Sequence, residues 1–251
     1  MRSDLAALAA VLLWGSLASL AISLDTVPPL LMTGIGLVVG STIALPISGF
    51  KIRRLIPKKR VLLVGVYGLL GYHFALFAGL QNAPSVQANL VNYLWPILVV
   101  LLAPLFITGT KLTYMHWIAG ILGFSGAALA ILSGTELVGG FAVGYLYAGI
   151  AALIFSSYSL ISKGLADSPT AAVGGYSFVA GVLAIISHFT FEPAATIEPI
   201  QWLWLVLMGL GPLGGLFLPM GPRAQTCSGS TSWHNRLFHS PYFHCSATDS
   251  Y

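Results

Sequence analysis

The sequence predicts an all-α protein, a polytopic helix bundle that spans a membrane several times. Of its 251 residues, 57% are hydrophobic and only 7% are charged, and the mean hydropathy is +0.87. Soluble domains carry roughly a quarter charged residues. This composition therefore excludes a soluble enzyme, a disordered chain and a disulfide-stabilised secreted domain. The alternation of apolar and polar residues that a membrane barrel needs is also absent.

Apolar segments of membrane-spanning length recur along the chain. About 20 apolar residues are needed to cross the hydrocarbon core as a helix. The predicted spans are 5–24, 27–48, 61–80, 84–107, 115–133, 141–163, 170–191 and 200–220. The first of them is long enough to be an uncleaved helix rather than a signal peptide. The short connections between the spans predict one compact bundle.

The charges in the loops predict how the bundle is oriented. Threading the spans in order places most Lys and Arg residues on one side: Arg2, Lys51, Arg53, Arg54, Lys58, Lys59, Arg60, Lys111, Lys163 and Arg223. The opposite loops contain Asp25, Glu136, Glu192 and Glu198, and no Lys or Arg. Basic loops stay in the cytoplasm, so the N-terminus is predicted to be cytoplasmic in a multi-pass inner-membrane protein. The basic run at 51–60 is interpreted as a membrane-flanking loop, and no nucleic-acid partner is expected.

The chain also resembles itself at an offset of 141 residues. The aligned pairs are Ala10 with Ala151, Trp14 with Phe155, Gly15 with Ser156, Ser16 with Ser157, Pro28 with Pro169 and Gly68 with Gly209. A unit of five helices, an odd number, must enter the membrane from the other side when it repeats. The sequence thus predicts an inverted repeat, with a first unit at 1–136 and helices six to eight of an incomplete second unit at 137–219. In such repeats the substrate site lies at the interface of the units.

The last part of the chain, 220–251, differs in character from the rest. It contains no apolar span and is expected to be an aberrant, disordered tail. Its cysteines and histidines match no zinc-ligand spacing, so no metal site is expected; they are Cys227, His234, His239, His244 and Cys245. The codons after Pro219, read one base later, permit apolar sequence with Trp-Asp-Arg and Tyr-Phe-Thr-Pro. A frameshift near residue 219 is therefore a hypothesis, which the coding DNA tests.

No catalytic constellation is present in the sequence. There is no paired-histidine zinc motif, no Gly-x-Ser-x-Gly elbow and no P-loop, so neither an enzyme nor a cofactor is expected. Ionisable groups inside membrane spans are functional candidates by default, and here they are His73 and His188. His73 is the preferred candidate because Tyr72 and Phe74 flank it. A structural histidine that hydrogen-bonds within the bundle is an equally good interpretation.

The fourth span carries a polar and aromatic stripe. Asn89, Asn92, Tyr93 and Pro96 follow i, i+3, i+4 and i+7 spacing, which places them on one helix face. Trp95 borders that face, and Pro96 removes a backbone hydrogen bond and can kink the helix. Polar side chains are costly in lipid unless they face the bundle or a cavity. The stripe therefore predicts a cavity lining, with an interfacial aromatic belt or a helix-packing surface as the alternative.

Three motifs together resemble a known family. They are Asn-Tyr-Leu-Trp-Pro at 92–96, Trp-Gly-Ser at 14–16 and Gly-Pro-Leu-Gly at 211–214. From residue 5 to about 219 the chain resembles the EamA family of the drug/metabolite transporter superfamily, most closely its aromatic amino-acid exporters. The resemblance implies ten helices in two inverted units around a central cavity, of which helices nine and ten are lacking here. It also implies that the cavity is lined at the aromatic positions Trp14, Tyr72, Tyr93 and Trp95.

The leading hypothesis is a secondary transporter that exports small metabolites, most of all aromatic amino acids, by alternating access. Its partners would be a small-molecule substrate and membrane lipid. The candidate substrate-binding residues are Trp14, Tyr72, His73, Asn89, Asn92, Tyr93 and Trp95. The alternatives are a transporter of another solute such as a sugar or drug, an integral-membrane enzyme, and a non-functional truncated product.

Overall fold

The computed structural model describes residues 2–107, 109, 112–132, 142–165 and 171–214. Within these ranges every regular element is a helix and no strand occurs, so the all-α prediction is confirmed. The tail 220–251, Lys111, Glu136 and Pro169 lie outside the described residues.

The elements follow the eight predicted spans, although three of the spans are divided. The helices are α1 (Arg2–Ile22), α2 (Pro29–Ser41), α3 (Ala44–Ile47), α4 (Lys59–Gln81), α5 (Ser85–Asn92), α6 (Trp95–Phe106), α7 (Tyr114–Leu132), α8 (Val143–Lys163), α9 (Ala172–Phe191) and α10 (Pro199–Met208). A 3₁₀ turn, η1 (Ile52–Arg54), precedes α4, and a π-helical turn, η2 (Gly209–Leu213), continues α10.

Several helices are long and apolar enough to cross a membrane. Among the described residues these are Pro29–Ile47, Lys59–Gln81, Ser85–Phe106, Val143–Lys163 and Ala172–Phe191, and the stretches Leu12–Ile22 and Pro199–Leu213 are shorter apolar helices. The protein is therefore a multi-pass membrane bundle.

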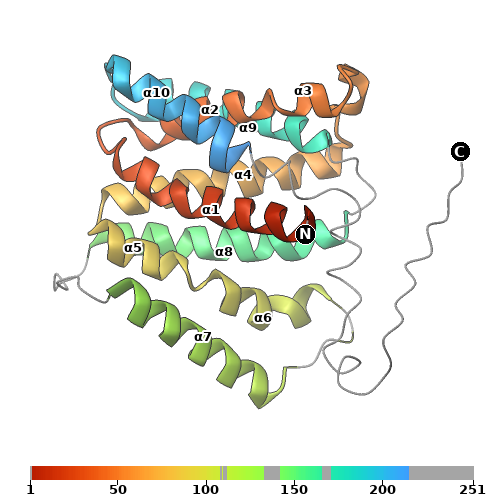
Figure 1. Ribbon diagram of the computed structural model, residues 1–251, viewed down its shortest axis with the longest axis vertical. Coiled ribbons are helices and arrows are strands. Elements are labelled where there is room, and N and C mark those ends of the chain that lie inside the picture. Colours follow the sequence, from red (N-terminus) through yellow and green to blue (C-terminus); the bar gives the residue numbers. More distant parts are fainter. Residues whose placement is uncertain (1, 108, 110–111, 133–141, 166–170, 215–251) are drawn as a thin grey trace, which may run out of the picture.

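The helices run alternately in opposite directions, so the connections gather at the two ends of the bundle. In Figure 1 the N-terminus of α1, α3 and the beginning of α4 lie at one end, together with the end of α8. This end carries the basic run 51–60 and Lys163. The turns after α1 and after α9 lie at the other end, which carries Asp25, Glu192 and Glu198. Basic and acidic loops thus occupy opposite ends of the bundle.

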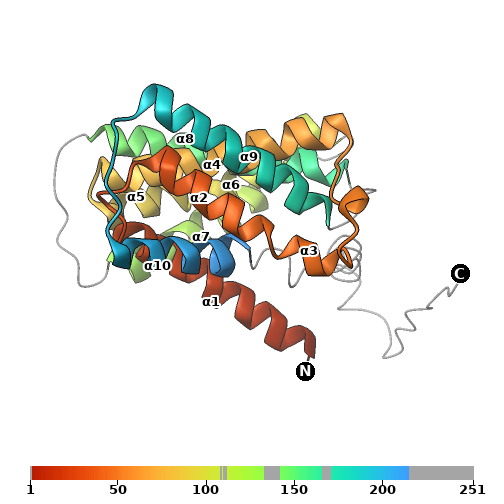
Figure 2. The same cartoon turned by 90° about the horizontal axis from the view of Figure 1, so that it is seen from above.

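Helices α2 and α9 pack closely and lie side by side in Figures 1 and 2. A Cβ atom on Gly34 would lie 3.0 Å from the carbonyl oxygen of Gly181, and one on Gly181 would lie 2.8 Å from that of Gly34. Further along, the Ser177 hydroxyl donates to the Leu37 carbonyl at 3.1 Å. Small residues let helix backbones approach in this way, so α2 and α9 form one tightly packed unit.

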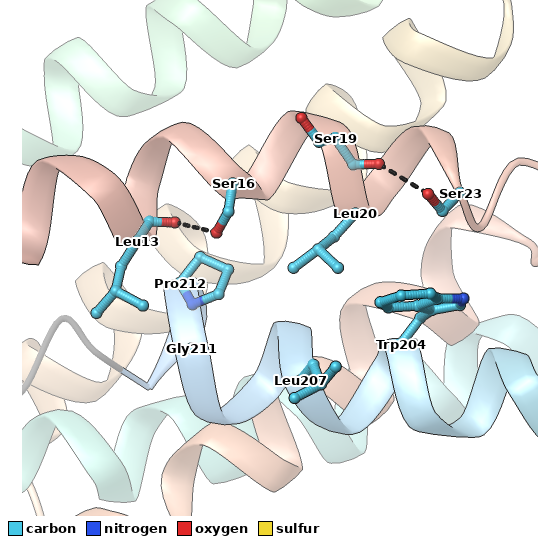
Figure 3. A pocket seen from close by; sticks show the side chains of 9 residues that line it. All are labelled: Leu13, Ser16, Ser19, Leu20, Ser23, Trp204, Leu207, Gly211 and Pro212. Atoms are coloured by element: carbon cyan, nitrogen blue, oxygen red, sulfur yellow. Dashed lines mark hydrogen bonds between the residues drawn. The ribbon is translucent and has the colours of Figure 1, made fainter.

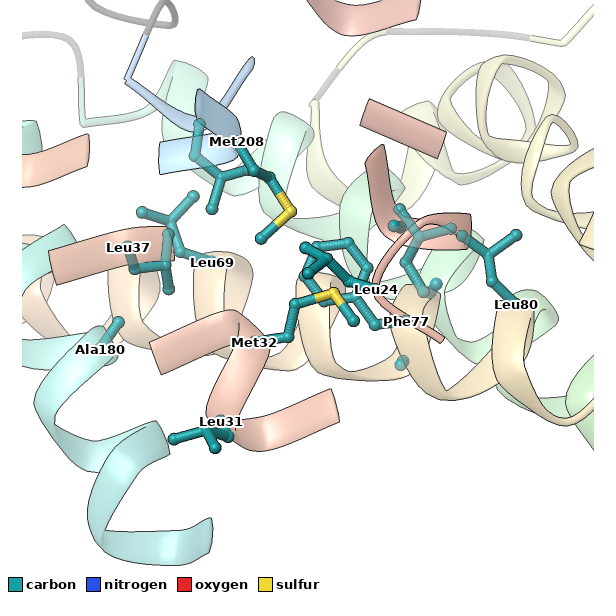
Figure 4. Close-up of a cluster of buried hydrophobic side chains, with 14 of the residues drawn as sticks. Leu24, Leu31, Met32, Leu37, Leu69, Phe77, Leu80, Ala180 and Met208 are labelled. Atoms are coloured by element: carbon teal, nitrogen blue, oxygen red, sulfur yellow. The ribbon is translucent and has the colours of Figure 1, made fainter. Parts of the chain in front are cut away.

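The apolar core lies where α2, α4 and α10 meet (Figure 4). Its fully buried side chains include Leu24 from the turn after α1, Met32 and Leu37 from α2, Phe77 from α4 and Met208 from α10. These residues come from both halves of the chain. The core therefore joins the halves rather than filling either of them.

Helix packing follows the 141-residue offset, which pairs α1 with α8, α2 with α9 and α4 with α10. Helix α4 packs on α8 and α9. Its counterpart, α10 with η2, packs on α1 and α2. The pair α5–α6 covers α8. On α1 the equivalent face is open, because a Cβ on Gly15, the counterpart of Ser156, would meet no other described atom within 4 Å.

Candidate functional site

The predicted fourth span is broken in its middle. Helix α5 ends at Asn92 and α6 begins at Trp95. Pro96 has no N–H, so it cannot donate to the Asn92 carbonyl as an ordinary helical residue would. The end of α5 instead has a hydrogen bond that spans three residues rather than four, from Leu94 N–H to the Val91 carbonyl at 3.1 Å. The break falls beside the proline where the sequence predicts a kink.

Beside this break, aromatic rings from three other helices gather around Phe155 of α8. The ring centroid of Phe155 lies 4.9 Å from that of Trp95 on α6, 4.9 Å from that of Tyr72 on α4 and 6.0 Å from that of Trp14 on α1. The Trp95 and Trp14 rings meet Phe155 edge to face, at 75° and 80°, an arrangement that aromatic quadrupoles favour. We call Trp14, Tyr72, Trp95 and Phe155 the ring cluster.

Next to Phe155, Ser156 fixes α6 against α8. Its side chain is fully buried. Its hydroxyl lies 2.9 Å from the Trp95 carbonyl and 2.6 Å from the carbonyl of Ala152 on its own helix. The hydroxyl thus reaches a backbone carbonyl at the start of α6, and this contact holds the Trp95 ring over Phe155.

Polar groups join the ring cluster from α5. The Asn92 side chain is only 5% exposed, and its amide group hydrogen-bonds the Tyr72 hydroxyl. Tyr93 also lies close to Tyr72. Tyr93 and Trp14 are 39% and 40% exposed, so the cluster has a buried wall at Asn92 and an accessible side at these two rings.

Two other predicted site residues, His73 and Asn89, lie outside the ring cluster. His73 is buried, and its Nδ1 lies 2.7 Å from the Leu69 carbonyl one turn earlier, so its polar contact stays within α4. Its ring touches the cluster only through Tyr72, at a centroid distance of 4.9 Å. Asn89 is half-buried one turn before Asn92, and none of the described ring contacts involves it. His188 lies at the end of α9, where it pairs with Glu192 at 2.8 Å.

The sequence prediction missed two residues of the site, Phe155 and Ser156. One signal for them was available, because the 141-residue offset aligns Phe155 with Trp14 and Ser156 with Gly15. Residue type alone gave no reason to prefer this phenylalanine over the twelve others.

A second concave feature lies apart from the ring cluster. It is a groove of about 450 Å³ between α1 and α10–η2 (Figure 3), lined by Leu13, Ser16, Ser19, Leu20, Ser23, Trp204, Leu207, Gly211 and Pro212. The Ser16 hydroxyl donates to the Leu13 carbonyl at 2.7 Å and the Ser23 hydroxyl to the Ser19 carbonyl at 3.1 Å. Since two of its three serine hydroxyls bond their own helix and the other lining side chains are mostly apolar, the ring cluster is the better candidate site.

The chemistry that the ring cluster offers is non-covalent. Together with Asn92 and Tyr93, it presents aromatic faces, an amide and two phenolic hydroxyls. Among the described residues no group of His, Cys, Asp and Glu side chains is placed to hold a metal ion. The arrangement is suited to binding a small molecule that has both an apolar ring and polar groups.

Comparison with known proteins gives the family. The model of the EamA-like transporter family matches residues 1–132, more than half of the chain. The chain belongs to the EamA-like transporter family. The family resemblance and the membrane-transporter class predicted from the motifs are thereby confirmed.

Two relatives extend the likeness over most of the chain. A protein from Ancylobacter novellus named "Aromatic amino acid exporter YddG" is 36% identical over 216 residues, which are 83% of this chain and 74% of that protein. A solved crystal structure has a TM-score of 0.72 at 33% identity and covers 87% of this chain and 77% of its own. The fold of this EamA-like transporter is therefore shared with an experimentally determined structure.

Proposed function

We propose that this EamA-like transporter exports aromatic amino acids across the inner membrane by alternating access, with the ring cluster as its substrate-binding site. The observation that carries the proposal is the convergence of Trp14, Tyr72, Trp95 and Phe155 beside the break between α5 and α6. The likeness to a protein named as an aromatic amino acid exporter supports the same substrate class.

The ring cluster suits such a substrate physically. An aromatic side chain would pack edge to face or offset against the rings, each pair contributing about 0.5–1.5 kcal/mol beyond burial. Asn92, with the Tyr72 and Tyr93 hydroxyls, would supply hydrogen bonds, which are stronger in a cavity of low dielectric than in water. The protein would thus act through binding and movement, with no covalent step.

The inverted repeat supports a transport mechanism. We propose that residues 1–136 form one unit and 137–219 belong to the other, with the N-terminus in the cytoplasm. The symmetric packing of α4 on α8 and α9, and of α10–η2 on α1 and α2, supports this division. Three of the four rings come from α1, α4 and α6, and Phe155 comes from α8. The rings therefore straddle the boundary between the units, and rocking one unit against the other would open the site to alternate sides.

Flux measurements test the proposal. The 251-residue chain is reconstituted in liposomes loaded with radiolabelled phenylalanine or tryptophan, and efflux is compared with that of empty liposomes and with loads of a sugar and of a cationic dye. Efflux of the two aromatic amino acids alone is the expected result. Efflux of the sugar or dye in their place would contradict it and indicate a transporter of another solute.

A further inference from the structure

Beside the ring cluster lies a buried acceptor with no partner in the part of the chain that the structure describes. This atom is Oδ1 of Asn92; the only other such side-chain atom there is Oγ1 of Thr33 on α2. Leaving a buried polar group unsatisfied costs about 1–3 kcal/mol, so folded proteins retain few of them. Of the two atoms, only Asn92 Oδ1 belongs to a residue that contacts the ring cluster.

The surroundings of this oxygen favour a positively charged donor. Asn92 is the last residue of α5, and the C-terminal end of a helix carries partial negative charge. Its backbone carbonyl also lacks the N–H that Pro96 cannot supply. Asn92 therefore has two acceptor oxygens at the end of α5, and an N–H donor that carries positive charge would complement both.

The aromatic rings point to the same ligand chemistry. Cations are attracted to the faces of Trp, Tyr and Phe rings within about 6 Å. Asn92 hydrogen-bonds Tyr72, whose ring lies 4.9 Å from that of Phe155. Helices α5 and α6 contain no Asp, Glu, Lys or Arg, so these two helices would offer a cation only neutral oxygens and ring faces.

We infer that Asn92 Oδ1 accepts a hydrogen bond from the ammonium group of the substrate, and that this site recognises the ammonium rather than the carboxylate. The inference rests on the proposed function and adds a substrate class to it. Arylalkyl amines that lack a carboxylate should occupy the same site, whereas aryl carboxylic acids that lack the amine should not.

Competition between three ligands on the unmodified chain tests this. Binding of labelled phenylalanine to the purified protein in detergent is displaced by phenylalanine, by phenethylamine or by 3-phenylpropionate. We expect phenethylamine to compete at a concentration close to that of phenylalanine. Loss of one hydrogen bond to a charged group is about a tenfold effect or more, so 3-phenylpropionate should compete at least about tenfold more weakly.

Variants at Asn92 assign the preference to the amide oxygen. Asn92→Leu should weaken phenylalanine binding by about tenfold and remove the difference between the amine and the acid. Asn92→Asp keeps an acceptor and should keep the preference for the amine. Asn82→Leu is the matched control, because Asn82 lies at the end of α4, where its side chain donates to the Ala78 carbonyl at 2.9 Å.

The outcomes separate the inference from the proposed function. If the wild-type protein binds phenylalanine, but phenethylamine and 3-phenylpropionate displace it equally well, the inference alone is overturned. The same holds for a folded Asn92→Leu variant that keeps the wild-type preference. Absence of phenylalanine binding in the wild type would overturn the proposed function, and the inference with it.

Discussion

Trp14 and Phe155 occupy equivalent positions 141 residues apart in the sequence, and their rings meet edge to face with centroids 6.0 Å apart. Two residues related by an internal two-fold repeat touch each other only close to the axis that relates the repeats. In the inverted repeat proposed above, their contact would mark the place where the two units of the bundle meet. Because the same two rings belong to the ring cluster, any rocking of one unit against the other would change the shape of the site.

The central place of Phe155 predicts that its removal weakens substrate binding strongly. Phe155→Ala deletes the ring that contacts Trp14, Tyr72 and Trp95. Aromatic pairs contribute about 0.5–1.5 kcal/mol each, and 1.4 kcal/mol corresponds to tenfold. We expect phenylalanine affinity to fall by about tenfold or more, measured by equilibrium binding, with efflux from liposomes falling in parallel.

The control for this variant is Phe178→Ala. Phe178 lies half-exposed on α9 and none of the ring contacts involves it. The Phe178→Ala variant also removes a phenyl ring from a helix. Its affinity for phenylalanine should stay within about twofold of the wild type, since surface substitutions generally have small effects. Equal affinities for Phe155→Ala and the wild type would show that the ring cluster only packs helices.

Topology is predicted from the charges at the two ends of the bundle. Lys58 precedes α4 at the basic end, and Glu198 precedes α10 at the acidic end. Since basic loops stay in the cytoplasm, a cysteine introduced by Glu198→Cys should react with a membrane-impermeant maleimide added to intact cells. One introduced by Lys58→Cys should react only after the cells are opened. Labelling of position 58 in intact cells would reverse the proposed orientation.

The span boundaries and the helix break could be predicted because both depend on neighbouring residues. Continuous apolar stretches mark the helices, and Pro96 acts on the turn that contains it. The cap that Glu192 provides to α2 could not be predicted, because Glu192 and Leu30 lie 162 residues apart and no local pattern relates them. Phe155 lies between these cases, since the repeat aligns it with Trp14 while only the packing of four helices brings the rings together.

The close approach of α2 and α9 predicts an asymmetric effect of adding methyl groups to two glycines. In Gly34→Ala the new Cβ would lie 2.5 Å from a side-chain carbon of Ile185 and 3.0 Å from backbone atoms of α9. Overpacking of this kind costs about 1–3 kcal/mol. In Gly15→Ala the new Cβ would meet no other described atom within 4 Å. Ala favours helix over Gly by up to about 1 kcal/mol.

Thermal unfolding in detergent measures this difference. Gly34→Ala should lower the unfolding temperature, and Gly15→Ala should leave it unchanged or raise it slightly. Because both variants add the same methyl group to a helix, helix propensity cancels in the comparison. Equal unfolding temperatures for the two would mean that the α2–α9 contact is looser than the packing described above.

The last prediction concerns Glu192, which joins the end of α9 to the beginning of α2. Its carboxylate accepts hydrogen bonds from the backbone N–H groups of Leu30, at 2.8 Å, and Leu31, at 3.4 Å, and lies 2.8 Å from His188 Nδ1. The first N–H groups of a helix have no partner within the helix, and a negative charge there is favourable. Removing this cap should cost about 1–3 kcal/mol, so Glu192→Ala should lower the unfolding temperature.

Hydrogen exchange locates the effect. In Glu192→Ala the amides of Leu30 and Leu31 should exchange faster, while amides in the middle of α2 should keep most of their protection, since their helical bonds remain. Glu192→Gln keeps an acceptor oxygen without the charge and should fall between the wild type and Glu192→Ala. Glu198→Ala is the control, because Glu198 caps α10 in a local capping box with Gln201 and should leave the Leu30 amide unchanged. Unaltered exchange at Leu30 in Glu192→Ala would mean that the carboxylate does not tie the two helices together. Faster exchange confined to these amides would show that the Glu192 carboxylate caps α2 at the acidic end of the bundle, beside the close packing of α2 on α9.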